Sequence, residues 1–334
     1  MSHIRLLYID RLKGFAIYLV VLGHILQHYF SDSALIVRVI YSFHIPLFMF
    51  MSGFVCYRKT EWSFITQKAW QLLIPFFSYI LLRWCFDYIT SVSTISLSQY
   101  FTSVLLHPDH GLWFLWALFF ISVIFIVSRK ISNTIKVPEI CIHIAIAVIL
   151  NTIVMFLHFR LFGFHWIAWY YVYFIAGVLW RYKVNNINTS CSLPRKIFIT
   201  TVIAFPVTAY FFRMHNEAPT FYEYINLGAY FPIFYRLLVG FLGIGLCLSY
   251  FQIISNNNAI YRKLKYWGAV SLGIYYLHFF LLEILYRMII SNNTIETAII
   301  TFFASIIISW QSATYSNKIN TNHIFALLIN GKRL

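Results

Sequence analysis

Long apolar stretches separated by short polar segments dominate the chain. Because an α-helix rises about 1.5 Å per residue, about 20 mostly apolar residues are needed to cross the hydrocarbon core of a bilayer. This rule predicts an all-α, polytopic membrane bundle of about ten transmembrane helices, forming a single integral-membrane domain over residues 1–334. The predicted helices cover approximately residues 12–30, 35–56, 69–90, 112–128, 139–158, 164–180, 197–212, 228–251, 267–289 and 295–313.

The placement of basic residues predicts the orientation of these helices. Short cytoplasmic loops retain Lys and Arg, so the side of the membrane that holds most of them is the inside. With the N-terminus inside, most of the 25 Lys and Arg residues lie in inner segments. The six exceptions are Arg38, Arg83, Arg160, Arg213, Arg236 and Arg287. We therefore expect the N-terminus and the C-terminus on the cytoplasmic side.

Composition changes this picture little, but it excludes several classes of protein. Hydrophobic residues make up 60% of the chain and charged residues 10%, whereas a soluble domain carries about a quarter charged residues. The net charge of +15 could indicate a nucleic-acid partner, but retained cytoplasmic loops explain it, and we expect no nucleic acid. The five cysteines stand singly without a CxxC pair, so neither a disulfide framework nor a zinc site is indicated.

Three histidines fall near the predicted middle of the membrane. His24 follows Lys13 by 11 residues, or roughly 16 Å, and His278 lies a similar distance beyond the inner residue Lys265. His44 precedes the next inner boundary by about 13 residues. Ionisable residues at this depth tend to face a bundle interior or a wet cavity and mark a reaction or transport path. The alternative is three neutral imidazoles that only hydrogen-bond between helices.

Helical phase relates the first of these histidines to a cation. Eleven residues at about 100° each come within about 20° of three full turns, so Lys13 and His24 share one face. This arrangement suits a donor whose anionic part stays in the cytoplasm while its reactive end reaches inward. The alternative is that Lys13 only contributes to the excess of basic residues on the cytoplasmic side of a membrane protein.

Two other charged residues each have two interpretations. Arg236 lies near the middle of a predicted helix and needs an anion or a polar cavity, and a salt bridge to Glu283 or Asp87 would satisfy it. Asp10 could be the N-cap of the first helix, or it could orient a nearby cation. Because there is no HExxH motif, we expect no metal site.

Five sequence blocks together resemble the acyltransferase family 3 membrane proteins. In order along the chain they are YIDRLKGFAIYLVVLGH, FHIPLFMFMSGFV, QKAWQLLIPFF, GLWFLWALFF and SLGIYYLHFF. The resemblance runs from about residue 8 to residue 310. This family includes O-acetyltransferases that modify surface polysaccharides and other envelope glycans, so the resemblance implies a multi-pass enzyme of the bacterial inner membrane.

The resemblance also implies roles for particular residues. The family's basic residue, ten-residue spacer and essential histidine fall on Lys13 and His24. The Ser-Gly of the second block falls on Ser52 and Gly53, and the Trp of the fourth block on Trp113. Some members carry an RxxR element after the second helix. Here that stretch lacks RxxR and holds Arg58, Lys59 and Lys68, which we expect to contact the phosphates of coenzyme A together with Lys13.

The activity implied by the resemblance is transfer of an acyl group from acyl-CoA, most simply acetyl-CoA, to a hydroxyl of a glycan or lipid-linked sugar. The donor is a substrate, and no permanently bound cofactor is expected. We expect His24 to act as a general base towards the sugar hydroxyl, with His44 or Ser52 orienting or stabilising the developing charge. A covalent acyl-enzyme is a further option. His278 would lie beside this centre.

Two other classes of function remain open. A transporter or flippase for an envelope glycan precursor would use intramembrane histidines and Arg236 along its path. Such folds often carry inverted repeats with interrupted helices in matching halves, which the sequence does not reveal. An inactive scaffold in a polysaccharide export complex is the third class, and the intact basic-x10-His spacing argues against it.

Overall fold

The computed structural model describes residues 7–57, 59, 61–90, 94–186, 192–214, 217–225, 227–228, 230–254, 258–288, 294–319 and 321–331. Within these residues all regular secondary structure is helical, as expected where lipid offers the backbone no hydrogen-bond partners. The longer helices are α1 (Leu7–Tyr29), α2 (Leu35–Cys56), α4 (Ile74–Ile89), α6 (Trp113–Ile135), α7 (Glu139–Leu157), α8 (Phe164–Asn186), α9 (Ser192–Phe211), α10 (Phe231–Ile253), α12 (Ser271–Met288) and α13 (Thr294–Ile319). The shorter ones are α3 (Trp62–Lys68), η1 (Ala69–Leu73), α5 (Leu97–Leu106), η2 (Pro108–His110), η3 (Leu161–Gly163), η4 (Thr220–Glu223), α11 (Ala259–Ala269) and α14 (His323–Asn330).

Each of the ten predicted membrane segments coincides largely with helix, which confirms the all-α prediction. Among the described residues, six helical stretches are long and apolar enough to cross a membrane. They are Leu35–Cys56, Trp62–Ile89, Trp113–Ile135, Glu139–Leu157, Leu161–Val184 and Phe231–Ile253. The first helix, α1, is equally long but carries His24, Gln27 and His28 among its apolar residues. The number of spans and the inward orientation of both termini stay predictions.

Two segments differ from the sequence-based expectation. The predicted helix over 267–289 is interrupted at Val270, where α11 ends and α12 begins. The N-terminus of α11 is set by Asn258, whose side chain accepts the backbone N–H of Tyr261. The second is α5, which lies between the predicted segments 69–90 and 112–128, where no helix is predicted, and opens with a capping box formed by Ser96 and Gln99.

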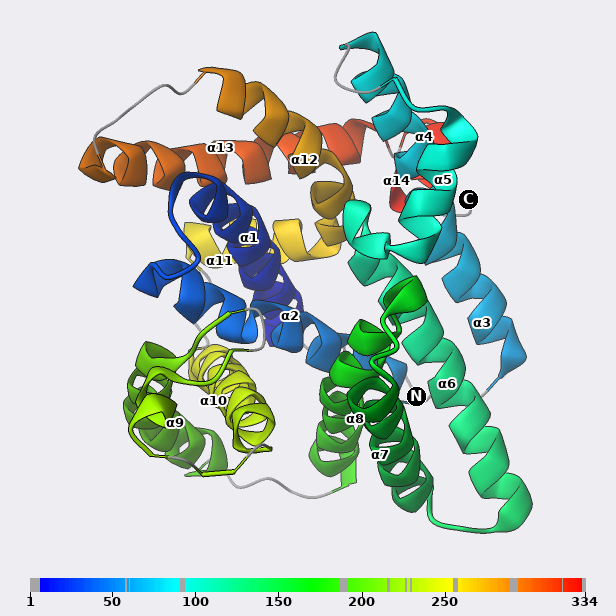
Figure 1. Cartoon of the computed structure of the whole chain (residues 1–334), viewed down its shortest axis with the longest axis vertical. Helices are drawn as coiled ribbons and strands as arrows, with labels where there is room; N and C mark the ends of the chain where they lie inside the picture. Colours follow the sequence, from blue (N-terminus) through cyan, green and yellow to red (C-terminus); the bar gives the residue numbers. More distant parts are fainter. Residues whose placement is uncertain are drawn as a thin grey trace. The chain divides into compact units, whose positions relative to one another are not determined.

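The chain forms two compact units, each built from separate stretches of sequence. Unit 1 comprises Met1–Met51 and Lys183–Tyr315, and unit 2 comprises Ser52–Tyr182 and Ser316–Leu334. In unit 1, α1 packs against α10, α11 and α12, and α9 packs against α10 (Figure 1). In unit 2, α6 packs against α3, η1 and α7, and α4 packs against α5 and α14.

The closest approach between helices in unit 1 joins α1 to α11 through two glycines. A Cβ atom on Gly14 of α1 would overlap the carbonyl oxygen of Leu264, and a Cβ on Gly268 of α11 would overlap the carbonyl oxygen of Asp10. Small residues permit this kind of backbone contact between helices in a membrane. The contact holds α11 against the N-terminal half of α1, the half that carries Lys13.

Candidate active site

The three mid-membrane histidines predicted from the sequence lie near one another in unit 1. The ring centroids of His24 on α1 and His278 on α12 are 5.4 Å apart. Tyr41 on α2 lies between His24 and His44, with ring-centroid distances of 6.4 Å and 4.8 Å. His44 is 2% exposed and His278 is fully buried, whereas His24 is partly exposed. Of the three, His24 therefore offers the most accessible imidazole.

A chain of hydrogen bonds leads from His24 to an acidic residue. Tyr41 Oη lies 3.5 Å from His24 Nδ1 and donates its proton to Gln27 Oε1 at 2.6 Å. Gln27 Nε2 in turn donates to Asp32 Oδ1 at 3.1 Å. Sequence reasoning did not assign Tyr41, Gln27 or Asp32 to this chain of hydrogen bonds. Spacing offered a signal, because Gln27 follows His24 by three residues and Tyr41 precedes His44 by three, which are same-face positions of a helix.

The direction of this chain follows from what each group can donate. An ionised carboxylate only accepts hydrogen bonds, so the Gln27 amide must turn its N–H towards Asp32 and its oxygen towards Tyr41. The phenolic proton is then committed to Gln27, and the lone pairs of Tyr41 Oη face His24 Nδ1. An imidazole that donates from Nδ1 carries an unprotonated Nε2 in its neutral form. The arrangement thus favours the tautomer of His24 that is a base at Nε2.

The other two histidines use Nδ1 against backbone carbonyls one helical turn earlier. His44 Nδ1 donates to the Ile40 carbonyl at 2.7 Å, and His278 Nδ1 donates to the Ile274 carbonyl at 3.1 Å. In the neutral form each Nε2 can then only accept a hydrogen bond. Among the described residues, the buried Nε2 of His278 has no hydrogen-bond partner. A buried acceptor without a partner costs free energy, and a substrate hydroxyl or amide would relieve that cost.

The C-terminal end of α1 is held to α12 by Tyr286. The Tyr286 hydroxyl donates to the backbone carbonyl of His24 at 3.2 Å. Its ring stacks on His28, with centroids 3.6 Å apart and planes 11° apart. These contacts fix the turn of α1 that follows His24, so they also fix the position from which its imidazole projects.

Two sequence-predicted residues lie at the N-terminal part of α1. Lys13 is half-buried and lies on the same helix as His24, as predicted. Asp10 lies inside the first turn of α1, which already includes Leu7, so the N-cap prediction is wrong. A carboxylate in the first turn still interacts favourably with the N–H groups that a helix leaves unpaired at its start.

The predicted site residues Ser52, Lys59, Lys68 and Trp113 belong to unit 2. Lys59 and Lys68 lie on the same aromatic ring, with their Nζ atoms 5.8 Å and 5.5 Å from the centroid of Phe64. Arg58 lies outside the described residues. Ser52 is on α2, eight residues after His44. Trp113 opens α6.

Aromatic stacking fixes Trp113. Its ring lies 4.0 Å from that of Trp166 and 5.5 Å from that of Tyr170, both on α8. The tryptophan of the fourth sequence block therefore joins two helices of unit 2 through ring contacts.

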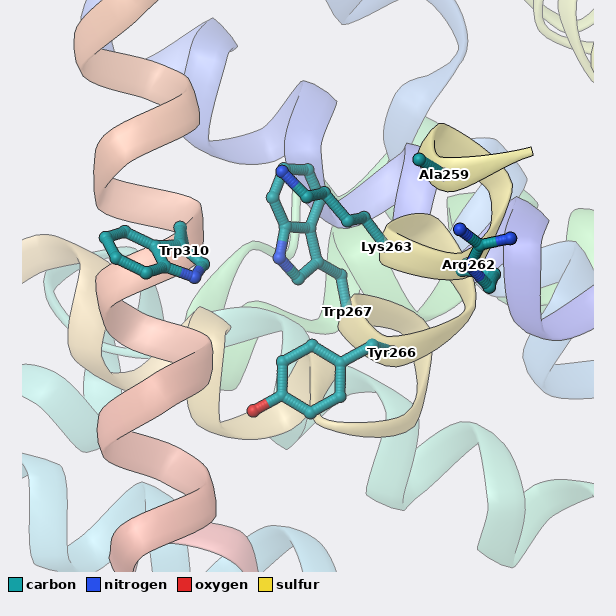
Figure 2. Close-up of a pocket in the computed structure, with 6 residues that line it drawn as sticks. All are labelled: Ala259, Arg262, Lys263, Tyr266, Trp267 and Trp310. Atoms are coloured by element: carbon teal, nitrogen blue, oxygen red, sulfur yellow. The ribbon is translucent and has the colours of Figure 1, made fainter.

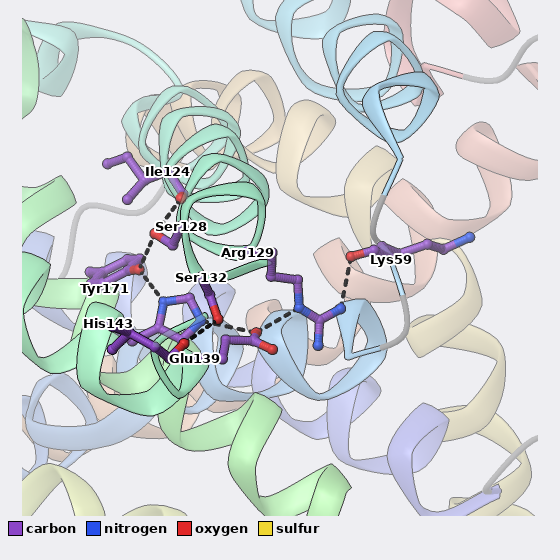
Figure 3. Close-up of polar contacts among 9 residues, drawn as sticks. Lys59, Ile124, Ser128, Arg129, Ser132, Glu139, His143 and Tyr171 are labelled. Carbon is purple, nitrogen blue, oxygen red and sulfur yellow. Dashed lines mark hydrogen bonds and ion pairs between the residues drawn. The ribbon is translucent and has the colours of Figure 1, made fainter. Parts of the chain in front are cut away.

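A polar network that sequence reasoning missed reaches the Lys59 segment at one end (Figure 3). Arg129 on α6 donates to the Lys59 carbonyl at 2.9 Å and pairs with Glu139 on α7 at 2.6 Å. His143 Nε2 lies 3.1 Å from Glu139 Oε1, and its Nδ1 lies 2.7 Å from the hydroxyl of Tyr171 on α8. The network ties three helices to the segment that follows α2.

Arg236 on α10 meets a carbonyl and an aromatic ring. Its Nη1 donates to the Arg213 carbonyl at 3.1 Å, and its guanidinium carbon lies 5.1 Å from the centroid of the Phe212 ring. Asp87, one of the two anions expected for Arg236, pairs with Arg83 on its own helix at 3.0 Å. These contacts favour a structural role for Arg236 at the junction of α9 and α10. Among the described residues no group of three or more His, Cys, Asp or Glu side chains is arranged to hold a metal ion.

Comparison with known proteins is informative at the level of the family. The chain is 31% identical over 190 residues to the nodulation protein NolL of Mesorhizobium japonicum, which covers 52% of this chain and 50% of that protein. It is 35% identical over 128 residues to NolL of Sinorhizobium fredii, covering 33% and 32%. The chain thus aligns with half or less of each of these relatives, and no solved structure matches it. A family model described as an acyltransferase domain matches residues 6–313, so this multi-pass membrane protein belongs to the acyltransferase 3 family.

Proposed function

We propose that the protein transfers an acyl group, most simply acetyl, from cytoplasmic acyl-CoA to a hydroxyl of a cell-envelope sugar or polysaccharide, in the inner membrane of a bacterium. The observation that carries this proposal is the environment of His24. This partly exposed imidazole is oriented at Nδ1 by Tyr41, and its ring centroid lies 5.4 Å from that of the buried His278. Family membership supports acyl transfer as the reaction class.

The reaction follows from the lone pair at His24 Nε2. As the sugar oxygen attacks the thioester carbonyl carbon, Nε2 takes the hydroxyl proton, which is general base catalysis. The resulting imidazolium is stabilised at Nδ1 by the oxygen of Tyr41. When the tetrahedral intermediate collapses, the carbon–sulfur bond breaks and the proton on Nε2 passes to the departing thiolate. The products are the O-acyl sugar and free coenzyme A.

Other residues act on binding and charge. The Nε2 of His278, which has no hydrogen-bond partner among the described residues, accepts a hydrogen bond from a substrate hydroxyl or amide. His44 donates its Nδ1–H to the Ile40 carbonyl, so its Nε2 orients neighbouring groups by accepting a hydrogen bond. The hydroxyl of Ser52 remains the candidate donor to the oxyanion. Lys13, Arg58, Lys59 and Lys68 bind the phosphates of coenzyme A through charge-assisted hydrogen bonds.

The direct test is acetyl transfer by the purified protein in detergent, with labelled acetyl-CoA and an extract of envelope glycans as acceptor. His24→Gln keeps a polar side chain of similar size but removes the base, and we expect its rate to fall by about a hundredfold or more. His107→Gln, outside the centre, is the matched control and should retain the wild-type rate. Wild-type turnover by His24→Gln would refute the proposal.

Mass spectrometry identifies the acceptor. Envelope glycans from cells with and without the gene are compared, and the proposal expects the loss of an ester increment whose mass names the acyl group. The same increment should return when the wild-type gene is restored and stay absent with His24→Gln. Unchanged ester content in the deletion strain would argue against an envelope sugar as acceptor.

A further inference from the structure

A pocket of unit 1 lies apart from the histidine centre, between α11 and α13 (Figure 2). It has a volume of about 320 Å³, which is within the range of small-molecule sites. Its lining consists of Ala259, Arg262, Lys263, Tyr266, Trp267 and Trp310. Figure 2 shows the Tyr266 and Trp267 rings and the Lys263 side chain on the side of α11 that is turned towards α13, and Trp310 on α13 itself.

The aromatic walls of the pocket are held in place by neighbouring contacts. Tyr266 donates from its hydroxyl to the Ala313 carbonyl on α13 at 3.1 Å. Trp267 is nearly buried and stacks on Tyr18 of α1, with centroids 6.1 Å apart and planes 21° apart. Trp310 is 55% exposed, so much of its indole is free to receive a ligand. A flat ring that enters here would meet ring surfaces that are already positioned.

The chemistry of the lining indicates a ligand with a flat ring and a negative charge. Aromatic side chains stack on nucleic-acid bases without regard to sequence, because every base has a π face. Lys263 adds an ammonium group beside these rings, and Arg262 adds a guanidinium group at the pocket's edge. Such cations bind phosphate through charge-assisted hydrogen bonds. An adenine nucleotide combines both features in one molecule.

The position of the pocket relative to α1 relates it to the histidine centre. Gly14 and Gly268 hold α11 against α1, and Tyr18, which stacks on Trp267, precedes His24 by six residues. Six helical residues correspond to about 9 Å along the axis. A ligand bound at Trp267 would thus need a spacer to reach His24, and coenzyme A carries a pantetheine arm between its adenosine phosphates and its sulfur.

We infer that this pocket binds the phosphorylated adenosine end of the acyl-CoA donor, with Trp310 stacking on the adenine and Lys263 contacting a phosphate. The inference rests on the proposed function, because it names a second binding region for the same donor. An anionic lipid headgroup shares the phosphate chemistry and is the competing source. It lacks the flat ring that three aromatic walls favour.

The experiment measures binding of adenosine 3′,5′-bisphosphate, which carries the adenine and phosphates but no acyl group. Isothermal titration calorimetry is done on the whole purified chain in detergent, so the result does not depend on catalysis. Lys263→Gln and Trp310→Leu should each weaken binding about tenfold, the effect of losing one charge-assisted hydrogen bond or one stacked ring. The same variants should raise the KM for acetyl-CoA with little change in kcat.

Two matched controls separate the pocket from general effects. Lys265→Gln removes a cation from the same helix but outside the lining, and should leave binding unchanged. Trp310→Phe keeps a ring and should retain most of the affinity. Thermal unfolding of each variant shows whether it is folded, and a variant that unfolds early is replaced by the milder Lys263→Met or Trp310→His.

The outcomes distinguish this inference from the proposed function and from a lipid site. Wild-type affinity for the bisphosphate in Lys263→Gln and Trp310→Leu would overturn the inference, while acetyl transfer by the same proteins would leave the proposed function intact. If the wild type binds the bisphosphate but transfers no acetyl group, the proposed function fails while the nucleotide site stands. In nanodiscs, loss of stabilisation by phosphatidylglycerol in Lys263→Gln, with unchanged bisphosphate binding, would assign the pocket to a lipid headgroup.

Discussion

The phenol of Tyr41 stands edge-on to the imidazole of His24, with the ring planes 85° apart and Tyr41 Oη 3.5 Å from His24 Nδ1. Since the Tyr41 hydroxyl donates a hydrogen bond to Gln27, the phenolic oxygen is left as an acceptor for the imidazole N–H. The relationship joins a residue of α1 to a residue of α2 and specifies which nitrogen of His24 is basic. Its energetic weight can be measured directly.

Tyr41→Phe removes the hydroxyl while keeping the ring that packs against His24 and His44. We expect kcat for acyl transfer to fall about tenfold, which corresponds to about 1.4 kcal/mol, the scale of one hydrogen bond. The KM values should stay within about twofold, because the hydroxyl orients the base rather than the substrates. Initial rates at saturating donor and acceptor give the answer. Tyr29→Phe is the control, since the buried Tyr29 hydroxyl has no hydrogen-bond partner among the described residues.

Gln27→Met breaks the same chain one bond further from His24. We expect a loss of kcat similar to that of Tyr41→Phe, because Tyr41 then lacks the acceptor that directs its proton away from the imidazole. The double variant should be no slower than the slower single variant, since both act through one path. Fully additive losses in this double-mutant cycle would mean that the two residues act independently.

His278→Phe replaces an imidazole whose buried Nε2 lacks a partner in the described part of the chain. Replacing an unsatisfied polar group by an apolar one of similar shape is neutral or stabilising, so the Tm in detergent should stay the same or rise. Acyl transfer should nevertheless fall at least about tenfold if Nε2 accepts a substrate hydrogen bond. His278→Asn, which keeps an N–H for the Ile274 carbonyl but lacks Nε2, should lose activity in parallel. Full activity in both variants would limit His278 to packing.

Gly14→Ala and Gly268→Ala test the contact between α1 and α11. Each added Cβ overlaps a backbone carbonyl that cannot move without shifting a helix, so each should destabilise the protein by about 1–3 kcal/mol or more. Thermal unfolding in detergent measures the effect. Gly245→Ala is the control, because its new Cβ would meet only methyl groups of Thr201 and Ile197 at 3.1 Å and 3.5 Å. Equal Tm values for all three variants would contradict the close contact.

Arg129→Met removes the group that connects Glu139 to the Lys59 carbonyl. The side chains of Arg129 and Glu139 are 12% and 35% exposed, so the loss should be about 1–3 kcal/mol, below that of a fully buried pair. Trypsin should also cleave faster after Lys59, and mass spectrometry of the fragments reports this. Lys130→Met, an exposed neighbour on the same helix, should change neither quantity.

The sequence was most informative where a pattern depends on one helix alone. Hydrophobic length located all ten helical segments, and a spacing of 11 residues related Lys13 to His24 on α1. Depth counting brought His24, His44 and His278 to one level; the counts for His24 and His44 ran along single helices, whereas the count from Lys265 to His278 crosses the break at Val270. The proximity of the three rings in unit 1 agrees with this common depth.

What the sequence could not predict depends on contacts between helices. The apolar run over 267–289 gave no sign of the break at Val270, because the break accompanies packing of Gly268 on the backbone of α1. The partner of the His24 imidazole is Tyr41, whereas His44 donates its N–H to the Ile40 carbonyl. The network through Arg129 includes a hydrogen bond between residues 70 positions apart, so it too depends on tertiary contacts.

The reciprocal glycine contact has a consequence for selectivity. With the backbones of α1 and α11 in contact at Gly14 and Gly268, the position of Trp267 along α1, beside Tyr18, is fixed relative to His24. With the adenosine end of the donor in the inferred pocket, this fixed spacing would set the height at which the donor presents its sulfur. The protein would then select donors by the length of the spacer between the adenosine phosphates and the sulfur, independently of side-chain contacts with the acyl group.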